Sequence, residues 1–205
     1  MEPDLAKRFN LLNFGERYEK IPTRIFMDTN IIQYLGTYGE FIFENYFEDD
    51  IFLDQRGEEL SPFLINEINS LRILLLGIDR SPFHFAFSLN IYNEVQKKGD
   101  ASLSSYFLDL YQYWQSIVWD LGNAAFSGAG KGHLRNVKTD TSIIGALSKK
   151  DFHVFCDAVE LECNAILTCD KFRKRQNWIY DKYNIMVLSP TDLLEIMKDF
   201  QGLYC

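Results

Sequence analysis

The feature that most constrains this fold is a short apolar run ending in an aspartate, which occurs twice, far apart. Residues 24–28 read Arg-Ile-Phe-Met-Asp, and residues 165–170 read Ala-Ile-Leu-Thr-Cys-Asp. Such runs, bounded by polar residues and interleaved with helical patterns, are typical of buried strands in a parallel sheet. Ligands of open α/β sheets bind outside the carboxyl ends of the strands, so we expect Asp28 and Asp170 at one rim. Two neighbouring carboxylates repel each other unless a proton or cation intervenes, which predicts a cation site there.

The remainder of the chain alternates between strand and helix patterns, which predicts the α/β class. Its 205 residues suit one domain with an insertion. We predict a central parallel sheet flanked by helices on both faces, with strands at about 23–27, 83–87, 165–169 and 184–188. An N-terminal arm (1–22) precedes the domain (23–205). A helical, acidic insertion (about 39–80) separates the first two strands, and a Gly-rich loop covers about 122–138.

Charge and cysteine content narrow the function classes. The net charge is −8, so a basic footprint for nucleic acid over the whole protein is missing, although local patches can still steer a polyanion. The four cysteines form no Cys-x-x-Cys pair, and there is no signal peptide, so we expect reduced thiols and a cytoplasmic protein. Cys169 is interpreted as a buried strand thiol rather than a nucleophile. No apolar run approaches the length of a membrane span.

Asp151 is the third candidate acid. It begins the inward stripe of a helix predicted over 150–163, which continues through Val154, Phe155, Ala158 and Leu161. A carboxylate in the first turn is also favoured by the exposed backbone N–H groups, so a purely structural role stays open. The same helical periodicity predicts that Asp157 faces solvent.

A glutamate is the fourth candidate, and two positions compete. Glu94 and Glu67 each lie six residues after a serine. We favour Glu94, because a credible strand precedes its helix and would deliver that helix to the sheet rim. Glu67 remains the alternative.

These motifs resemble those of the PIN domain family. Its members typically open with a strand followed by Asp-Thr/Ser-Asn, here Asp28-Thr29-Asn30, and close with an Asp-led helix running into a Thr-x-Asp-Lys-x-Phe-like segment, here from Thr168 to Phe172. The resemblance covers residues 23–35, 83–96 and 141–197. It leaves the N-terminal arm, the insertion and the Gly-rich loop unexplained.

The resemblance implies a nuclease that depends on Mg²⁺ or Mn²⁺ and most often hydrolyses RNA phosphodiesters. Hard divalent cations prefer carboxylate oxygens, which agrees with the acids found here. The resemblance assigns four residues to metal binding and catalysis: Asp28, Glu94, Asp151 and Asp170. It also assigns Asn30 and Thr168 to orienting these carboxylates or binding phosphate. The haloacid dehalogenase-like phosphatases are an alternative, because they also start from an aspartate at the end of a strand. They need a second aspartate two residues after the first, where this chain has Asn30, so this alternative is not favoured.

Cations near the third and fourth acids are candidates for binding RNA phosphates, with a solvated helix face as the plain alternative. They are Lys149, Lys150, Lys171, Arg173, Lys174 and Arg175. An RNA-processing enzyme and a toxin with an antitoxin-like protein inhibitor both fit the resemblance, and a homodimer stays open. The rival from another class is a PIN-like scaffold that binds RNA or protein without cutting.

Overall fold

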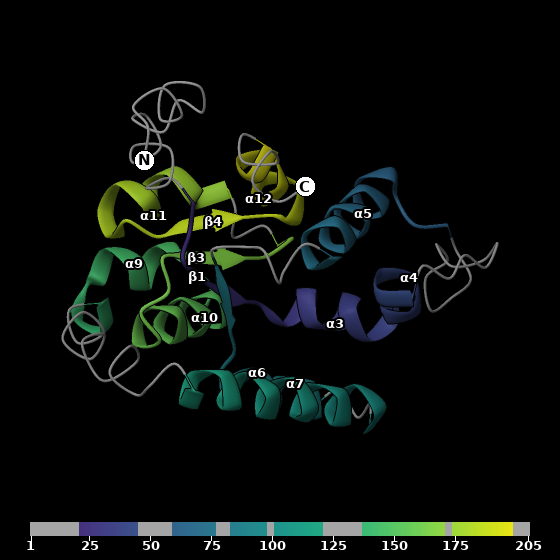
Figure 1. The fold of residues 1–205 in the computed structure, drawn as a ribbon. Coiled ribbons are helices and arrows are strands. Elements are labelled where there is room, and N and C mark those ends of the chain that lie inside the picture. Colours follow the sequence, from purple (N-terminus) through teal and green to yellow (C-terminus); the bar gives the residue numbers. More distant parts are fainter. Residues whose placement is uncertain are drawn as a thin grey trace, which may run out of the picture.

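The predicted α/β class is confirmed by the computed structural model, which describes residues 21–44, 59–76, 83–97, 101–120, 137–170 and 174–198. Four strands form one sheet in the order β2-β1-β3-β4, and every pair is parallel. The strands are β1 (Arg24–Met27), β2 (His84–Ala86), β3 (Ala165–Leu167) and β4 (Met186–Leu188). Figure 1 shows this sheet at the centre of the molecule, with helices packed around it.

The two central strands are short and apolar because both of their faces are covered. Phe26 pairs with Ile166 and Met27 with Leu167, and all four side chains are buried. Asn164, just before β3, fixes this register. Its Oδ1 accepts hydrogen bonds from the backbone N–H groups of Thr23 and Arg24, both at 3.0 Å.

Helices connect consecutive strands, as parallel pairing requires. The connection from β1 to β2 contains α3 (Thr29–Thr37), α4 (Gly39–Glu44) and α5 (Pro62–Leu76). The connection from β2 to β3 contains α6 (Leu89–Lys97), α7 (Ala101–Asp120), α9 (Thr141–Ala146) and α10 (Lys149–Glu160). Helix α11 (Gln176–Tyr183) joins β3 to β4, and α12 (Pro190–Lys198) follows β4. Helix α3 of the first connection packs against α6 and α7 of the second.

Helix α10 ends at Glu160, three residues before the predicted end. The N–H of Cys163 bonds the carbonyl of Ala158, and the N–H of Glu162 bonds that of Val159, which closes the helix as in a Schellman motif. Glu162 takes the left-handed conformation (φ 55°) that this closure requires. The periodic sequence pattern continued past the helix because Leu161 and Cys163 still pack towards the core.

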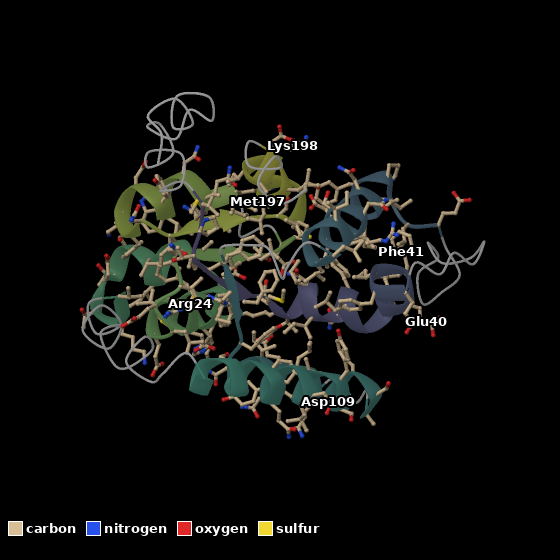
Figure 2. All side chains as sticks on the ribbon, in the orientation of Figure 1. Arg24, Glu40, Phe41, Asp109, Met197 and Lys198 are labelled. Atoms are coloured by element: carbon tan, nitrogen blue, oxygen red, sulfur yellow. The ribbon has the colours of Figure 1, made fainter. Side chains whose placement is uncertain are left out.

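The insertion adds its own packing to the domain. Phe41 of α4 is buried, and the Arg72 guanidinium of α5 lies 5.0 Å from the centre of its ring. Helix α5 packs on α12, whose Met197 is buried. In Figure 2 the exposed side chains of Glu40, Asp109 and Lys198 project from the outside of the molecule, while Phe41 and Met197 point inward.

Some sequence predictions fall outside the part of the chain described here. These concern the N-terminal arm up to residue 20, most of the acidic stretch (45–58) and the Gly-rich loop up to residue 136. Among the helices within the described ranges, none is long and apolar enough to cross a membrane.

Candidate functional site

Asp28 lies where β1 ends and α3 begins, and only 3% of it is exposed. It is the N-cap of α3: its Oδ1 accepts a hydrogen bond from the Thr29 N–H at 2.7 Å. Its own N–H bonds the Leu167 carbonyl of the neighbouring strand. The sequence places an aspartate here because the strand must end in a helix cap, and the fold buries that cap at the sheet rim.

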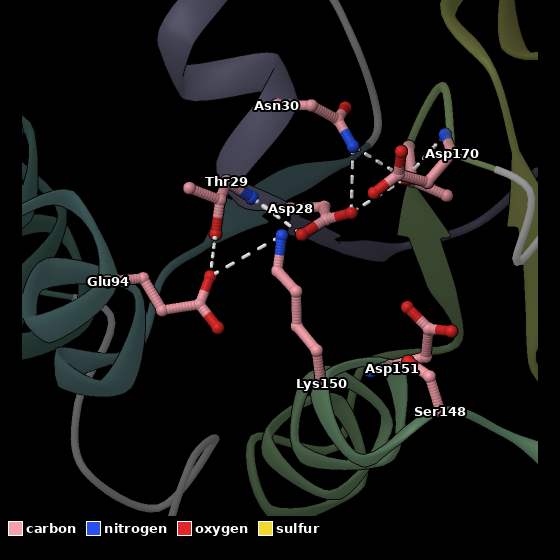
Figure 3. Close-up of polar contacts among 9 residues, drawn as sticks. Asp28, Thr29, Asn30, Glu94, Ser148, Lys150, Asp151 and Asp170 are labelled. Carbon is pink, nitrogen blue, oxygen red and sulfur yellow. Dashed lines mark hydrogen bonds and ion pairs between the residues drawn. The ribbon is translucent and has the colours of Figure 1, made fainter. Parts of the chain in front are cut away.

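Asn30 and Thr168 hold the other oxygen of this carboxylate. Asp28 Oδ2 accepts from Thr168 Oγ1 at 2.7 Å and from Asn30 Nδ2 at 2.9 Å. Asn30 Nδ2 also donates to Thr168 Oγ1, and Asn30 Oδ1 accepts from the Cys169 N–H. The ends of β1 and β3 are therefore tied together by side chains as well as by the sheet (Figure 3). The predicted role of Asn30 and Thr168 in orienting a carboxylate agrees with these contacts.

The Asp28 carboxyl has a raised pKa. Burial is the main cause, and the hydrogen bonds from Thr168 and from the Thr29 N–H act against it. The positive charge of Lys150 also lowers this pKa, while Asp170 raises it. A buried carboxylate with charged neighbours at a sheet rim is a typical functional-site candidate.

Glu94 approaches Asp28 from α6. Its Oε2 accepts a hydrogen bond from Thr29 Oγ1 at 2.8 Å and lies 3.7 Å from Lys150 Nζ. In Figure 3, Glu94 and Asp28 lie on either side of the Lys150 ammonium. The strand-then-helix argument that favoured Glu94 therefore led to a residue at this rim.

Glu67, the competing acid, is occupied elsewhere. It is 2% exposed, and its Oε2 accepts from the backbone N–H of Thr191 at 2.9 Å, in the first turn of α12. Ser70 Oγ lies 3.1 Å from Thr191 Oγ1 beside it. Glu67 therefore joins the insertion to the last helix.

Asp151 and Asp170 complete the rim. Asp151 is in the first turn of α10, where its N–H donates to Oγ of the N-cap Ser148 at 3.2 Å. Figure 3 shows its side chain rising from α10 on the same side as Lys150. Asp170 is exposed, follows β3, and donates its N–H to Thr168 Oγ1 at 3.1 Å.

The prediction that Asp157 faces solvent is wrong. Asp157 is 8% exposed and accepts hydrogen bonds from Ser88 Oγ at 2.6 Å and from Asn90 Nδ2 at 2.8 Å. Helix α10 is buried over six consecutive residues (154–159), because elements cover more than its one apolar stripe. Asp157 ties α10 to the start of α6 and so helps to fix the helix that carries Glu94.

The donor chemistry of the rim fits a hard divalent cation, since its acids are carboxylates without cysteine or histidine partners. Asp28, Glu94, Asp151 and Asp170 come from four separate segments. Within the described ranges, however, no three His, Cys, Asp or Glu side chains lie close enough together to hold one ion. The ammonium of Lys150, which is predicted to bind substrate, lies 3.7 Å from Glu94 Oε2.

The other residues singled out from the sequence lie at the surface, just beyond β3, or outside the described residues. Lys149, Lys174 and Arg175 are exposed, and Cys169 is half-buried just beyond β3 rather than within it. Lys171 and Arg173 lie outside the described residues. Sequence reasoning missed the Thr29–Glu94 hydrogen bond, although Thr29 was visible in the Asp-Thr-Asn motif. It also missed the pairing of Lys150 with Glu94, for which no local pattern exists.

Comparison with known proteins finds no relative of this chain. No family model, curated protein or solved structure matches the chain.

Proposed function

We propose that this protein is a PIN-like nuclease that depends on Mg²⁺ or Mn²⁺ and hydrolyses RNA phosphodiester bonds. One observation carries the proposal: Asp28 is buried at the carboxyl end of a central strand, with three further acids around the same rim. Burying a carboxylate costs free energy, and buried carboxylates with charged neighbours occur preferentially at functional sites.

The residues of the chain divide the work in this proposal. Asp28, Glu94, Asp151 and Asp170 would hold the cation. Asn30 and Thr168 fix the Asp28 carboxylate, and Thr29 fixes Glu94, so two of the four acids are oriented beforehand. The bound cation would supply an acidified water and neutralise charge on the phosphodiester.

RNA would approach the exposed side of the rim. Lys149, at the start of α10, and Lys174, after β3, are both exposed near the segments that carry the acids. Their side chains suit contacts to phosphate oxygens, which position RNA without reading its sequence. Such local cations fit a protein whose net charge is negative.

A second candidate function is a PIN-like scaffold that binds RNA or protein without cutting it. The observation in its favour is the Lys150–Glu94 ion pair, because this ammonium already balances the charge of one proposed metal-binding acid. In that case the acids and the lysine would neutralise each other, and no divalent cation would be needed.

Cleavage of single-stranded RNA with Mn²⁺, with Mg²⁺ and with a chelator tests the proposal. Wild type is compared with Asp28→Asn and Asp170→Asn, and with Asp109→Asn, which makes the same chemical change at an exposed position on α7. We expect metal-dependent cutting that is lost in both rim variants and kept in Asp109→Asn. Cutting that survives both rim substitutions would favour the scaffold. The absence of cutting under every condition would also favour it.

A further inference from the structure

Lys150 is the one residue of the described rim whose charge opposes that of the acids. Its Nζ lies 3.7 Å from Glu94 Oε2. Figure 3 shows the side chain reaching from α10 into the space between these two acids. Its side chain is nevertheless 47% exposed, so solvent reaches it.

The position of Lys150 in its own helix does not explain this arrangement. Lys149 and Lys150 are the first two residues of α10, where the helix dipole disfavours positive charge. The acids across the rim offset that cost for Lys150. Lys149 has the same disadvantage at the helix start, but among the described residues it forms no ion pair with these acids.

An ammonium ion and a divalent cation cannot share the same carboxylates without strong repulsion. The Lys150–Glu94 contact is long and half-exposed, and such pairs contribute little to stability. The lysine side chain is flexible, and its ammonium is readily hydrated outside the rim. Lys150 can therefore leave the acids at a small cost in free energy.

We propose that Lys150 is a displaceable counter-cation: it neutralises the rim before a divalent cation binds, and it must move out when one does. This inference rests on the proposed function, because it requires that the same acids bind metal. It implies that Lys150 sets the metal concentration at which the site fills. Once displaced, the ammonium lies at the exposed side of the rim, where it could donate hydrogen bonds to a phosphate.

The test is isothermal titration of Mn²⁺ into the full chain, which needs no activity. Lys150→Met and Lys150→Gln remove the charge, and Lys149→Met is the matched control from the same helical turn. Removing one positive charge close to the ion is expected to tighten Mn²⁺ binding about three- to tenfold in both Lys150 variants. Lys149→Met should change the affinity by less than about twofold, because an exposed charge further away is screened.

Each result bears on a different statement. Tighter Mn²⁺ binding in both Lys150 variants, without a similar gain in Lys149→Met, supports the counter-cation. Loss of Mn²⁺ binding in a Lys150→Met, Asp28→Asn double variant places the ion at this rim. Equal Mn²⁺ affinity in wild type and the Lys150 variants overturns the inference but keeps the metal site. An equal gain in Lys149→Met also overturns it, because the effect would then reflect net charge. No Mn²⁺ binding to wild type or to any variant overturns both the inference and the proposed metal dependence.

Discussion

Asp28 is the residue at which stability and proposed function compete. Its carboxylate is buried, which raises its pKa, and three hydrogen bonds from Thr29, Asn30 and Thr168 partly offset the cost of its charge. The Asp-Thr-Asn motif predicted the position of this acid. It could not predict that Thr168, 140 residues away and just after β3, would be its shortest side-chain partner, because such contacts depend on the register of β1 against β3.

Thr168→Val tests how much this partner contributes. Valine keeps the shape of the fully buried threonine but removes a donor to Asp28 and an acceptor for Asn30 and Asp170. Hydrogen bonds to charged groups contribute about 1.5–3 kcal/mol, so we expect a loss of about 2–3 kcal/mol in the free energy of unfolding, measured in urea. Thr141→Val, at an exposed position, should stay within about 0.5 kcal/mol of wild type. Equal stability of the two variants would contradict this role.

Asp157 predicts a pH dependence. Burial, above all, raises the pKa of its carboxyl, so the folded protein holds this proton to a higher pH than the unfolded chain does. Its contribution to stability therefore falls as the pH rises from the unfolded value of about 3.9 towards the folded value. Asp157→Asn removes this titration, so the unfolding free energy of wild type should fall relative to the variant as the pH rises above about 4. Parallel pH profiles of wild type and Asp157→Asn would argue against it.

At the scale of elements, α10 shows what periodicity can and cannot predict. The stripe of Val154, Phe155 and Ala158 was predicted as inward-facing and is buried. The burial of Asp157 was missed, because an amphipathic pattern reports one apolar face and not a polar contact on another. Ser88, just before α6, donates its hydroxyl to Asp157.

The end of α10 gives a prediction for the backbone. Glu162 adopts φ 55°, a conformation that costs a residue with a side chain roughly 1–2 kcal/mol and glycine much less. Glu162→Gly loses the 3.8 Å contact with Arg24 and gains freedom in the unfolded chain, which together offset part of that relief. We expect the variant to be about 0.5–1 kcal/mol more stable in urea denaturation. Glu160→Gly, at the last residue of the helix, should instead be destabilised by up to about 1 kcal/mol.

At the scale of the whole molecule, the sequence was sufficient for the class of the fold. Four apolar runs alternating with helical patterns predicted the parallel sheet, since buried strands of this kind have few other arrangements. The order β2-β1-β3-β4 and the packing of α5 on α12 depend on contacts between distant segments, and no local pattern encodes them. The same limit applies to the site: the sequence indicated which acids follow strands, but not that Lys150 pairs with Glu94.

The two competing glutamates belong to this scale, because they assign the site either to the helix after β2 or to the insertion. Glu94 contacts the residue next to Asp28, whereas Glu67 bonds the backbone of α12. Glu94→Gln should weaken Mn²⁺ binding in calorimetry by at least about tenfold, because it removes a charged ligand. Glu67→Gln retains an oxygen that can accept from the Thr191 N–H, so its Mn²⁺ affinity should equal that of wild type.

Glu67→Ala, which leaves that buried donor unpaired and adds a cavity, should cost about 2–4 kcal/mol of unfolding free energy with no specific effect on metal affinity. If Glu67→Gln lost Mn²⁺ binding while Glu94→Gln kept it, the insertion would carry the fourth ligand, and the Thr29–Glu94 hydrogen bond would be a packing contact only.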